Sequence, residues 1–178
     1  MFFGIALLIF LVFVIKYAFI VVPEGYEYTV ERLGKFMYVL APGFHIITPF
    51  LDMVGSKVNM KEQTLNLPVV DVLTKDEVVL HIKGTMLFQI QDSVLATYQV
   101  RDLYQALLHL IEVNIRTQVS EKTKKEFLAQ QESICYKLRE VLDEATAPWG
   151  VKIIKIKVWD EALSPSDPFE KPDNYFAK

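Results

Sequence analysis

The start of the chain, up to Ile15, carries no charged side chain, and this run constrains its structure more than any other feature. Lys16 interrupts the run, and Tyr17–Val22 then continue it. Counted through to Val22, the run contains about 21 residues, which make about 31 Å of helix at a rise of about 1.5 Å per residue. Because a bilayer core is roughly 30 Å thick, the sequence predicts a transmembrane or membrane-anchor helix over residues 1–22.

The position of Lys16 leaves two kinds of anchor open. A lysine costs roughly 2.5–3.5 kcal/mol at the middle of a membrane, but in the last third of the run its long side chain reaches the headgroups. If the span ends at Ile15 instead, it is short for a transmembrane helix and forms an interfacial or re-entrant anchor. A cleaved signal peptide is disfavoured, because no basic residue precedes Lys16 and no Ala-x-Ala site follows the run. We therefore expect the bilayer to be contacted by Phe3, Leu7, Leu11, Ile15 and Lys16.

Positive charge gives this anchor an orientation. Lys16, Arg32 and Lys35 follow the apolar run, whereas its N-terminal flank carries no basic side chain. The positive-inside rule then places the rest of the chain in the cytoplasm. We expect a protein of the cell membrane, either single-pass or monotopic.

A second apolar segment covers residues 37–51 and carries no formal charge apart from His45. Pro42, Gly43 and Pro49 exclude a continuous helix, so this segment cannot be a second span. Two interpretations remain open: a pair of core strands joined by a turn, or an apolar loop that enters the membrane interface beside the anchor. In the second interpretation the lipid contacts are Phe44, Ile46, Ile47 and Phe50.

Strand patterns dominate the first part of the domain that follows. Tyr26–Arg32 alternates like a strand, and Glu77–Gln91 is the clearest strand of the chain. In the latter, apolar side chains fall on one face and mostly polar ones on the other, which is typical of an antiparallel sheet with one wet face. The apolar face comprises Val78, Leu80, Ile82, Met86, Phe88 and Ile90, with Gly84 in phase.

Two helices and a last strand complete the domain. Asp102–Gln105 and Thr123–Glu126 each have the form of a capping box, which predicts two helix starts. The first helix carries Leu103, Leu107, Leu110, Ile111 and Asn114 at helical spacing, and the second carries Ile134, Leu138, Val141, Leu142 and Ala145. Pro148-Trp149-Gly150 ends the second helix, and Val151–Trp159 returns to a strand. This order predicts an α+β domain over residues 23–160.

Composition narrows the function classes. With 52% hydrophobic and 23% charged residues, the chain has the material for a packed core and is not a disordered polymer. Its formal net charge of −3 provides no basic footprint for nucleic acid. Lys122, Lys124 and Lys125 form a small cluster, but Glu121 and Glu126 flank it, which indicates a solvated helix start.

No constellation of residues predicts catalysis, a cofactor or a metal. The three histidines, His45, His81 and His109, have no second ligand at a metal-binding spacing. Cys135 is the only cysteine and has no histidine near it in sequence, so we expect a small buried side chain. Asn114 and Arg116 lie in a largely apolar helix and need partners, either within the chain or in a neighbouring subunit.

Several ordered blocks resemble the stomatin/prohibitin/flotillin (SPFH, or band 7) family. The first is Val22-Pro-Glu-Gly-Tyr-Glu-Tyr-Thr-Val-Glu-Arg-Leu-Gly-Lys-Phe36, and the second is Leu40-Ala-Pro-Gly-Phe-His-Ile-Ile-Thr-Pro-Phe-Leu-Asp52. Shorter blocks follow in the same order: Lys57-Val-Asn-Met, Thr74-Lys-Asp, Asn114-Ile-Arg and Ala147-Pro-Trp-Gly-Val-Lys-Ile153. Within the family, the chain is most similar to bacterial QmcA-like or paraslipin stomatin homologues.

The resemblance implies a non-enzymatic scaffold. It implies a homo-oligomer, or a hetero-oligomer with full-length SPFH relatives, that bounds membrane microdomains and acts on membrane proteins or membrane proteases. An NfeD-type membrane protein is an implied partner. The resemblance also favours bilayer contact by the apolar segment around Pro42–Pro49.

The C-terminal residues 161–178 depart from the family. Pro165, Pro168 and Pro172 exclude the long coiled-coil helix that the family carries here, so we expect a short tail that is extended or disordered. Closed-cage assembly is less expected as a result, and two other hypotheses stand beside the scaffold. One is a membrane-tethered hydrolase (protease), and the other is a short form that caps the assembly of full-length relatives.

Overall fold

A computed structural model describes residues 16–162, which form two compact units. The first unit contains the start of the described chain up to Gln63, together with Phe88–Leu103 and Ala145–Lys152. The second contains Thr64–Leu87, Tyr104–Glu144 and the chain from Ile153 onward. Strands β7 (Val79–Ile90) and β8 (Val151–Asp160) each contribute residues to both units. The α+β fold predicted from the sequence is confirmed.

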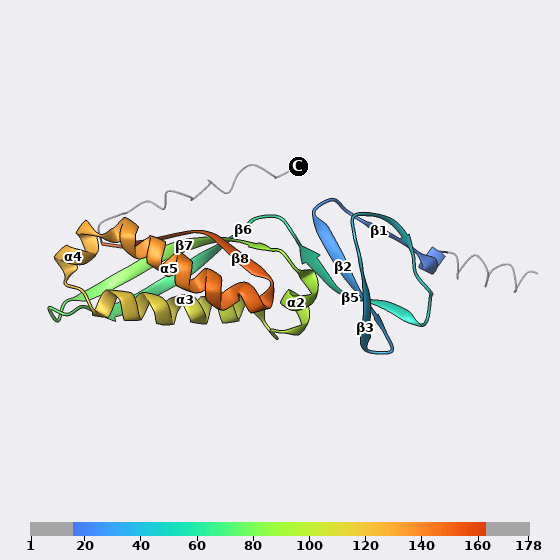
Figure 1. Cartoon of the computed structure of the whole chain (residues 1–178), viewed down its shortest axis with the longest axis horizontal. Helices are drawn as coiled ribbons and strands as arrows, with labels where there is room; N and C mark the ends of the chain where they lie inside the picture. Colours follow the sequence, from blue (N-terminus) through green and yellow to red (C-terminus); the bar gives the residue numbers. More distant parts are fainter. Residues whose placement is uncertain (1–15, 163–178) are drawn as a thin grey trace, which may run out of the picture. The chain divides into compact units, whose positions relative to one another are not determined.

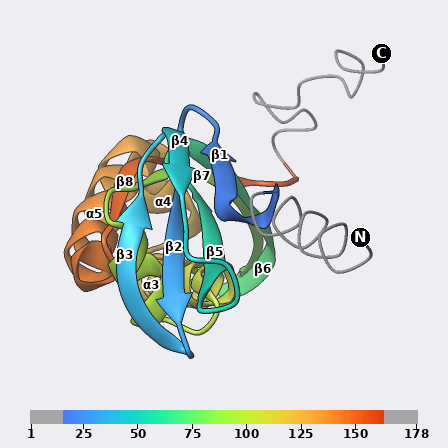
Figure 2. The ribbon, with the colours of Figure 1, turned by 90° about the vertical axis from the view of Figure 1, so that its right-hand side faces the viewer.

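Five strands and one short helix build the first unit: β1 (Phe19–Val22), β2 (Tyr26–Arg32), β3 (Lys35–Leu40), β4 (Gly43–Ile46), β5 (Asp52–Asn59) and α2 (Ser93–Tyr98). β1 and β4 pair antiparallel in a two-stranded ribbon, and β3, β2 and β5 form an antiparallel sheet in that order (Figure 2). Val22 from β1, Val30 from β2, Leu40 from β3 and Ile47 after β4 form one buried cluster. The ribbon and the sheet therefore share a core.

Helix α2 is held against β2 by polar contacts. Its N-cap Asp92 accepts hydrogen bonds from the backbone amides of Val94 and Leu95, each at 2.9 Å. Ser93 donates to Glu27 at 2.5 Å, and Tyr98 donates to Glu31 at 2.8 Å. This helix was not predicted from the sequence, because six residues are too few to establish a helical period.

The second unit contains most of the sheet β6-β7-β8, with β6 spanning Gln63–Leu73, and three helices. These are α3 (Leu103–Ser120), α4 (Lys124–Ala129) and α5 (Gln131–Thr146), and Figure 1 shows α3 and α5 running along one face of the strands. The predicted alternation of β7 is confirmed at every apolar position except Val78, which is exposed. The predicted stripe of α5 is confirmed at Ile134, Leu138 and Leu142, whereas Val141 is exposed.

The boundaries of α4 and α5 follow local rules. Thr123 caps α4 and forms a capping box with Glu126, as the sequence predicted. After α5, a 3-10 turn (Ala147–Trp149) leads into Gly150, whose φ of 67° is left-handed. A Cβ at Gly150 would lie 2.8 Å from the Cβ of Asp92, so only glycine fits there.

One prediction about the anchor is wrong. Residues 16–18 are helical, but Phe19–Val22 form strand β1 instead of the last turn of a helix over 1–22. The β-branched side chains of Ile20, Val21 and Val22 favour an extended backbone, and β4 provides the hydrogen-bonding partner. Among residues 16–162, no helix is long and apolar enough to cross a bilayer.

Candidate membrane-facing surface

One face of the β1–β4 ribbon is apolar at every position. Its register pairs Phe19 with Ile46 and Val21 with Phe44, so these four side chains project from the same face. We call them the ribbon face; their exposed fractions are 44% for Phe19, 67% for Ile46, 69% for Val21 and 62% for Phe44. The rings of Phe19 and Phe44 stack at 5.2 Å between centroids. A face exposed to this degree normally carries polar side chains.

The opposite face of the ribbon closes the core of the first unit. Val22 is buried, and Ile20 packs beside it against the cluster formed with Val30, Leu40 and Ile47. The ribbon is therefore fixed in register by its buried face, because a shift of one residue would expose these side chains. The same register determines which apolar side chains are left exposed.

A second group of exposed apolar side chains follows the ribbon. Phe50 and Leu51 lie in the turn between β4 and β5, and Met53 lies at the start of β5. Phe50 adopts a φ of 71°, which is uncommon for a bulky residue and marks a strained position. Together with Leu33, which follows the end of β2, we call these residues the sheet tip.

The ribbon face and the sheet tip share a cleft of about 560 Å³. Its walls come from the first residues of the described chain, from β1, and from the segment that leads into β5. The lining residues are Lys16, Tyr17, Phe19, Ile20, Ile47, Pro49, Phe50, Asp52, Met53 and Val54.

A buried carboxylate positions the turn that carries Phe50. Asp52 accepts two hydrogen bonds from Arg32, at 2.7 Å from Nε and 3.1 Å from Nη2, and one from the backbone amide of Thr48 at 3.0 Å. The backbone amide of Asp52 donates to the Thr48 carbonyl at 3.0 Å, which closes the turn. The hydrogen bond from Arg32 is the main cause that lowers the pKa of Asp52 to about 2, opposed by burial and assisted by Thr48. Asp52 is therefore ionised at neutral pH and holds both ends of the turn.

The structure separates the predicted membrane-contact residues into three groups. Phe44, Ile46 and Phe50 are exposed, and Lys16 is exposed beside them in the cleft. The prediction that Ile47 contacts lipid is wrong, because this side chain lies in the core with Val22. The remaining four predicted contacts lie outside the described residues: Phe3, Leu7, Leu11 and Ile15. The tail residues 163–178 also lie outside them.

The two candidate subunit contacts have partners on their own helix. The side-chain amide of Asn114 donates to the Leu110 carbonyl at 2.8 Å, and Arg116 forms an ion pair with Glu112 at 3.1 Å. Arg116 remains exposed, and it lines a shallow cleft on α3 with His109 and Glu112. Their predicted role between subunits stays a prediction.

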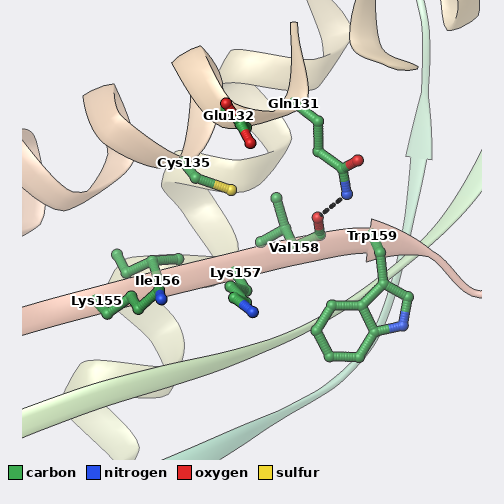
Figure 3. A pocket seen from close by; sticks show the side chains of 8 residues that line it. All are labelled: Gln131, Glu132, Cys135, Lys155, Ile156, Lys157, Val158 and Trp159. Atoms are coloured by element: carbon green, nitrogen blue, oxygen red, sulfur yellow. Dashed lines mark hydrogen bonds between the residues drawn. The ribbon is translucent and has the colours of Figure 1, made fainter. Parts of the chain in front are cut away.

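A separate cleft of about 590 Å³ lies between α5 and β8 in the second unit (Figure 3). Gln131 closes part of it by donating a hydrogen bond to the Val158 carbonyl, and Cys135 points into it. Burial is the main cause that raises the pKa of the Cys135 thiol. The thiol is therefore a poor nucleophile at neutral pH, and this cleft does not supply the activated residue that a hydrolase requires.

Comparison with known proteins decides the family. The SPFH domain / Band 7 family profile matches residues 20–166. The chain belongs to the SPFH family. The match begins within β1 and extends past the end of β8, so the ribbon is part of the SPFH domain.

Relatives of this SPFH protein come from archaea, bacteria and eukaryotes. An uncharacterized protein of Methanocaldococcus jannaschii is 33% identical over 156 residues, which cover 88% of this chain and 78% of the relative. One of Methanothermobacter thermautotrophicus is 36% identical over 129 residues, which cover 72% of this chain and 40% of the relative. Human mitochondrial stomatin-like protein 2 is 28% identical over 144 residues, which cover 81% of this chain and 40% of the relative. The chain thus spans about 40% of the length of most of the relatives it matches.

Several residues of this surface were not identified from the sequence. Phe19 and Val21 were assigned to a helix, and Leu33, Leu51 and Met53 were not assigned to any site. One local signal was present, because Leu33 precedes Gly34 in a turn where polar residues are usual. The pairing of Arg32 with Asp52 gives no local signal, since 20 positions separate the two residues.

Proposed function

We propose that this chain is a membrane-bound scaffold whose ribbon face lies against the lipid bilayer. The observation that carries the proposal is the exposed, wholly apolar face formed by Phe19, Val21, Phe44 and Ile46. An exposed apolar patch on a soluble domain marks a protein or membrane interaction site. Two further observations favour a membrane over a protein partner.

The first is continuity with the N-terminal apolar run. The uncharged sequence up to Ile15 is followed within four residues by Phe19, the first residue of the ribbon face. Lys16 and Tyr17, which connect the two, line the same cleft as Phe50. The run and the ribbon are adjacent in sequence, so both can meet one bilayer.

The second is membership of the SPFH family, which suggests a membrane-associated scaffold role. The energy available is adequate for a peripheral contact. Burying a side chain of this size in an apolar environment is worth about 1.5–3 kcal/mol when it is complete, so about 1 kcal/mol for each half-exposed side chain is realistic. Four such side chains provide about 4 kcal/mol, enough to hold a domain that is already tethered.

The proposal includes assembly. We propose that the chain self-associates or associates with longer SPFH relatives, and so organises membrane microdomains and modulates membrane proteins or membrane proteases, with an NfeD-type membrane protein as one partner. We propose that Arg116 on α3 contacts a neighbouring subunit in such assemblies, because its side chain remains exposed while it pairs with Glu112.

Membrane fractionation combined with crosslinking tests this proposal. The full chain is expected to pellet with membranes, to resist extraction by high salt, and to give higher-order species with an amine-reactive crosslinker. Arg116→Ala is expected to reduce the crosslinked species without releasing the protein from the membrane, and Glu140→Ala, which is also exposed on a helix of the same unit and removes no amine, is the control. Recovery of a soluble monomer after a salt wash contradicts the proposal.

A further inference from the structure

Two turns meet at one end of the sheet β3-β2-β5. Arg32, the last residue of β2, is the register partner of Lys35 in β3 and of Asp52 in β5. The turn Leu33–Gly34 and the turn that ends at Asp52 are therefore neighbours. Each presents a large apolar side chain to solvent, with Leu33 82% and Phe50 72% exposed.

Both side chains occupy an unfavourable backbone conformation. The φ of Leu33 is 52° and that of Phe50 is 71°, a region where glycine, asparagine or aspartate is usual. Apolar residues at such positions are neither the best turn formers nor buried in the domain core. Strain at exposed, adjacent positions is typical of a functional contact.

Most of the charged side chains around these two positions are basic. Leu33–Leu51 contains no aspartate or glutamate, and the basic side chains of Lys16, Arg32 and Lys35 are exposed to solvent at least in part. Two carboxylates lie nearby: Asp52 is buried and hydrogen-bonded to Arg32, and Glu31, the register partner of Met53, accepts a hydrogen bond from the Tyr98 hydroxyl. Of the five N–H donors that a guanidinium carries, Arg32 directs two at Asp52.

We propose that the sheet tip is a binding site for acidic phospholipids, an inference that rests on the proposed membrane contact. Leu33 and Phe50 enter the acyl boundary, while Lys16, Lys35 and the remaining donors of Arg32 contact the anionic headgroups. Asp52 compensates the charge of Arg32, so the two lysines determine the preference for negative charge. A basic side chain near an anionic membrane is worth about 1 kcal/mol, which corresponds to about a five-fold change in the membrane-inserted population for each lysine.

A fluorescent label on the sheet tip tests the inference in the full chain. The environment-sensitive dye NBD is attached at Met53→Cys in a Cys135→Ser background, since Met53 is exposed and lies in a regular strand. The protein is reconstituted into vesicles of phosphatidylcholine alone or mixed with phosphatidylglycerol. Nitroxide-labelled lipids quench NBD only where the sheet tip is inserted, so the extent of quenching gives the ratio of inserted to free tip. The N-terminal run carries no label and does not contribute to this signal. Lys16→Gln with Lys35→Gln is compared with Lys125→Gln and Lys137→Gln, two exposed lysines of the other unit.

The expected result is more insertion in the mixed vesicles. There, the Lys16/Lys35 variant lowers the inserted-to-free ratio about 25-fold at low salt, and the Lys125/Lys137 variant leaves it unchanged. Equal insertion in both vesicle types, or equal effects of the two variants, overturns the lipid preference and leaves the proposed membrane contact standing. Absence of insertion in both vesicle types overturns this inference, whereas the contact of the ribbon face is tested separately by labels at Phe44 and Ile46.

Discussion

Strand β7 and the β1–β4 ribbon each bury one apolar face, and their opposite faces differ. In β7, the buried Leu80 and Ile82 alternate with His81 and Lys83. Both polar residues have polar partners: His81 is hydrogen-bonded to Asp71 at 2.6 Å, and Lys83 forms an ion pair with Glu161 at 3.8 Å. At these two positions the outer face of β7 carries polar side chains that have polar partners. The outer face of the ribbon has no polar side chain at any of its four positions.

This difference teaches that apolar content alone does not identify a core. The ribbon face and the core of the second unit use the same side-chain types, but only the core positions contribute their full burial to folding. The four outward ribbon positions leave their apolar side chains exposed. Substitutions matched between the two regions separate these roles.

The largest effect is expected from truncating a buried phenylalanine. Phe127 in α4 is fully buried, and Phe127→Ala should lower the free energy of unfolding by about 3–5 kcal/mol. Phe44→Ala removes a side chain of the same type from the ribbon face and should cost about 1 kcal/mol, chiefly through its stacking on Phe19. Urea titration of the full chain in detergent micelles compares the two. Equal losses would contradict the distinction between the regions.

The second effect concerns the membrane. Replacing Phe44 and Ile46 by threonine keeps strand propensity but removes about 2 kcal/mol of apolar contact, which corresponds to about a 30-fold loss of bound ribbon. Hydrogen–deuterium exchange on vesicles should show protection of the β4 peptide in the parent chain and little in the variant. The control replaces Val69 and Leu73 by threonine, two exposed apolar residues of β6. If the control abolishes protection equally, the effect is not specific to the ribbon face.

A smaller effect is expected at the start of α4. Thr123→Ala removes the hydroxyl that accepts from the Glu126 amide, and should cost about 1 kcal/mol of stability. Thr117→Ala is the control, because this exposed threonine lies within α3 and bonds only the carbonyl one turn before it. Thermal unfolding followed by circular dichroism distinguishes the two. The membrane contact should be unchanged in both variants, because neither residue belongs to the first unit.

The last effect is the loss of stability when Asp52 is protonated, which occurs only in acid and not at neutral pH. Its pKa is lowered from 3.8 to about 2, so its contribution to stability is complete above about pH 4 and is lost as the pH falls towards 2. Asp52→Asn should remove this part of the acid dependence. The measurement is acid unfolding monitored by tyrosine fluorescence. An unchanged acid transition in the variant would show that the carboxylate does not hold the turn as inferred.

Much of the fold was predictable because its signals are local. The boundaries of β2, the alternation of β7, the cap at Thr123 and the stop at Gly150 each follow from neighbouring residues. The short helix α2 had only the N-cap Asp92 as a signal, without a helical period to support it. Local rules therefore suffice where an element is long or clearly capped.

The candidate site was less predictable, because its geometry depends on pairing between distant segments. Whether Ile46 or Ile47 faces outward is decided by the register of β4 against β1, and the sequence contains two equal isoleucines there. The apolar run into Val22 also concealed a strand, since a helix and a buried strand have the same composition over so few residues. The sequence thus identified the apolar residues up to Val22 correctly, but Phe19–Val22 form a strand and not a helix.

Depth measurement by electron paramagnetic resonance tests the central claim most directly. Nitroxide labels are placed singly at Phe44→Cys, Ile46→Cys and, as the control on α5, Tyr136→Cys, each in a Cys135→Ser background and in full-length protein on vesicles. The account predicts that labels at 44 and 46 are accessible to oxygen and shielded from a water-soluble nickel reagent, whereas the label at 136 shows the reverse. Accessibility of all three labels to the nickel reagent would contradict contact between the ribbon face and the bilayer.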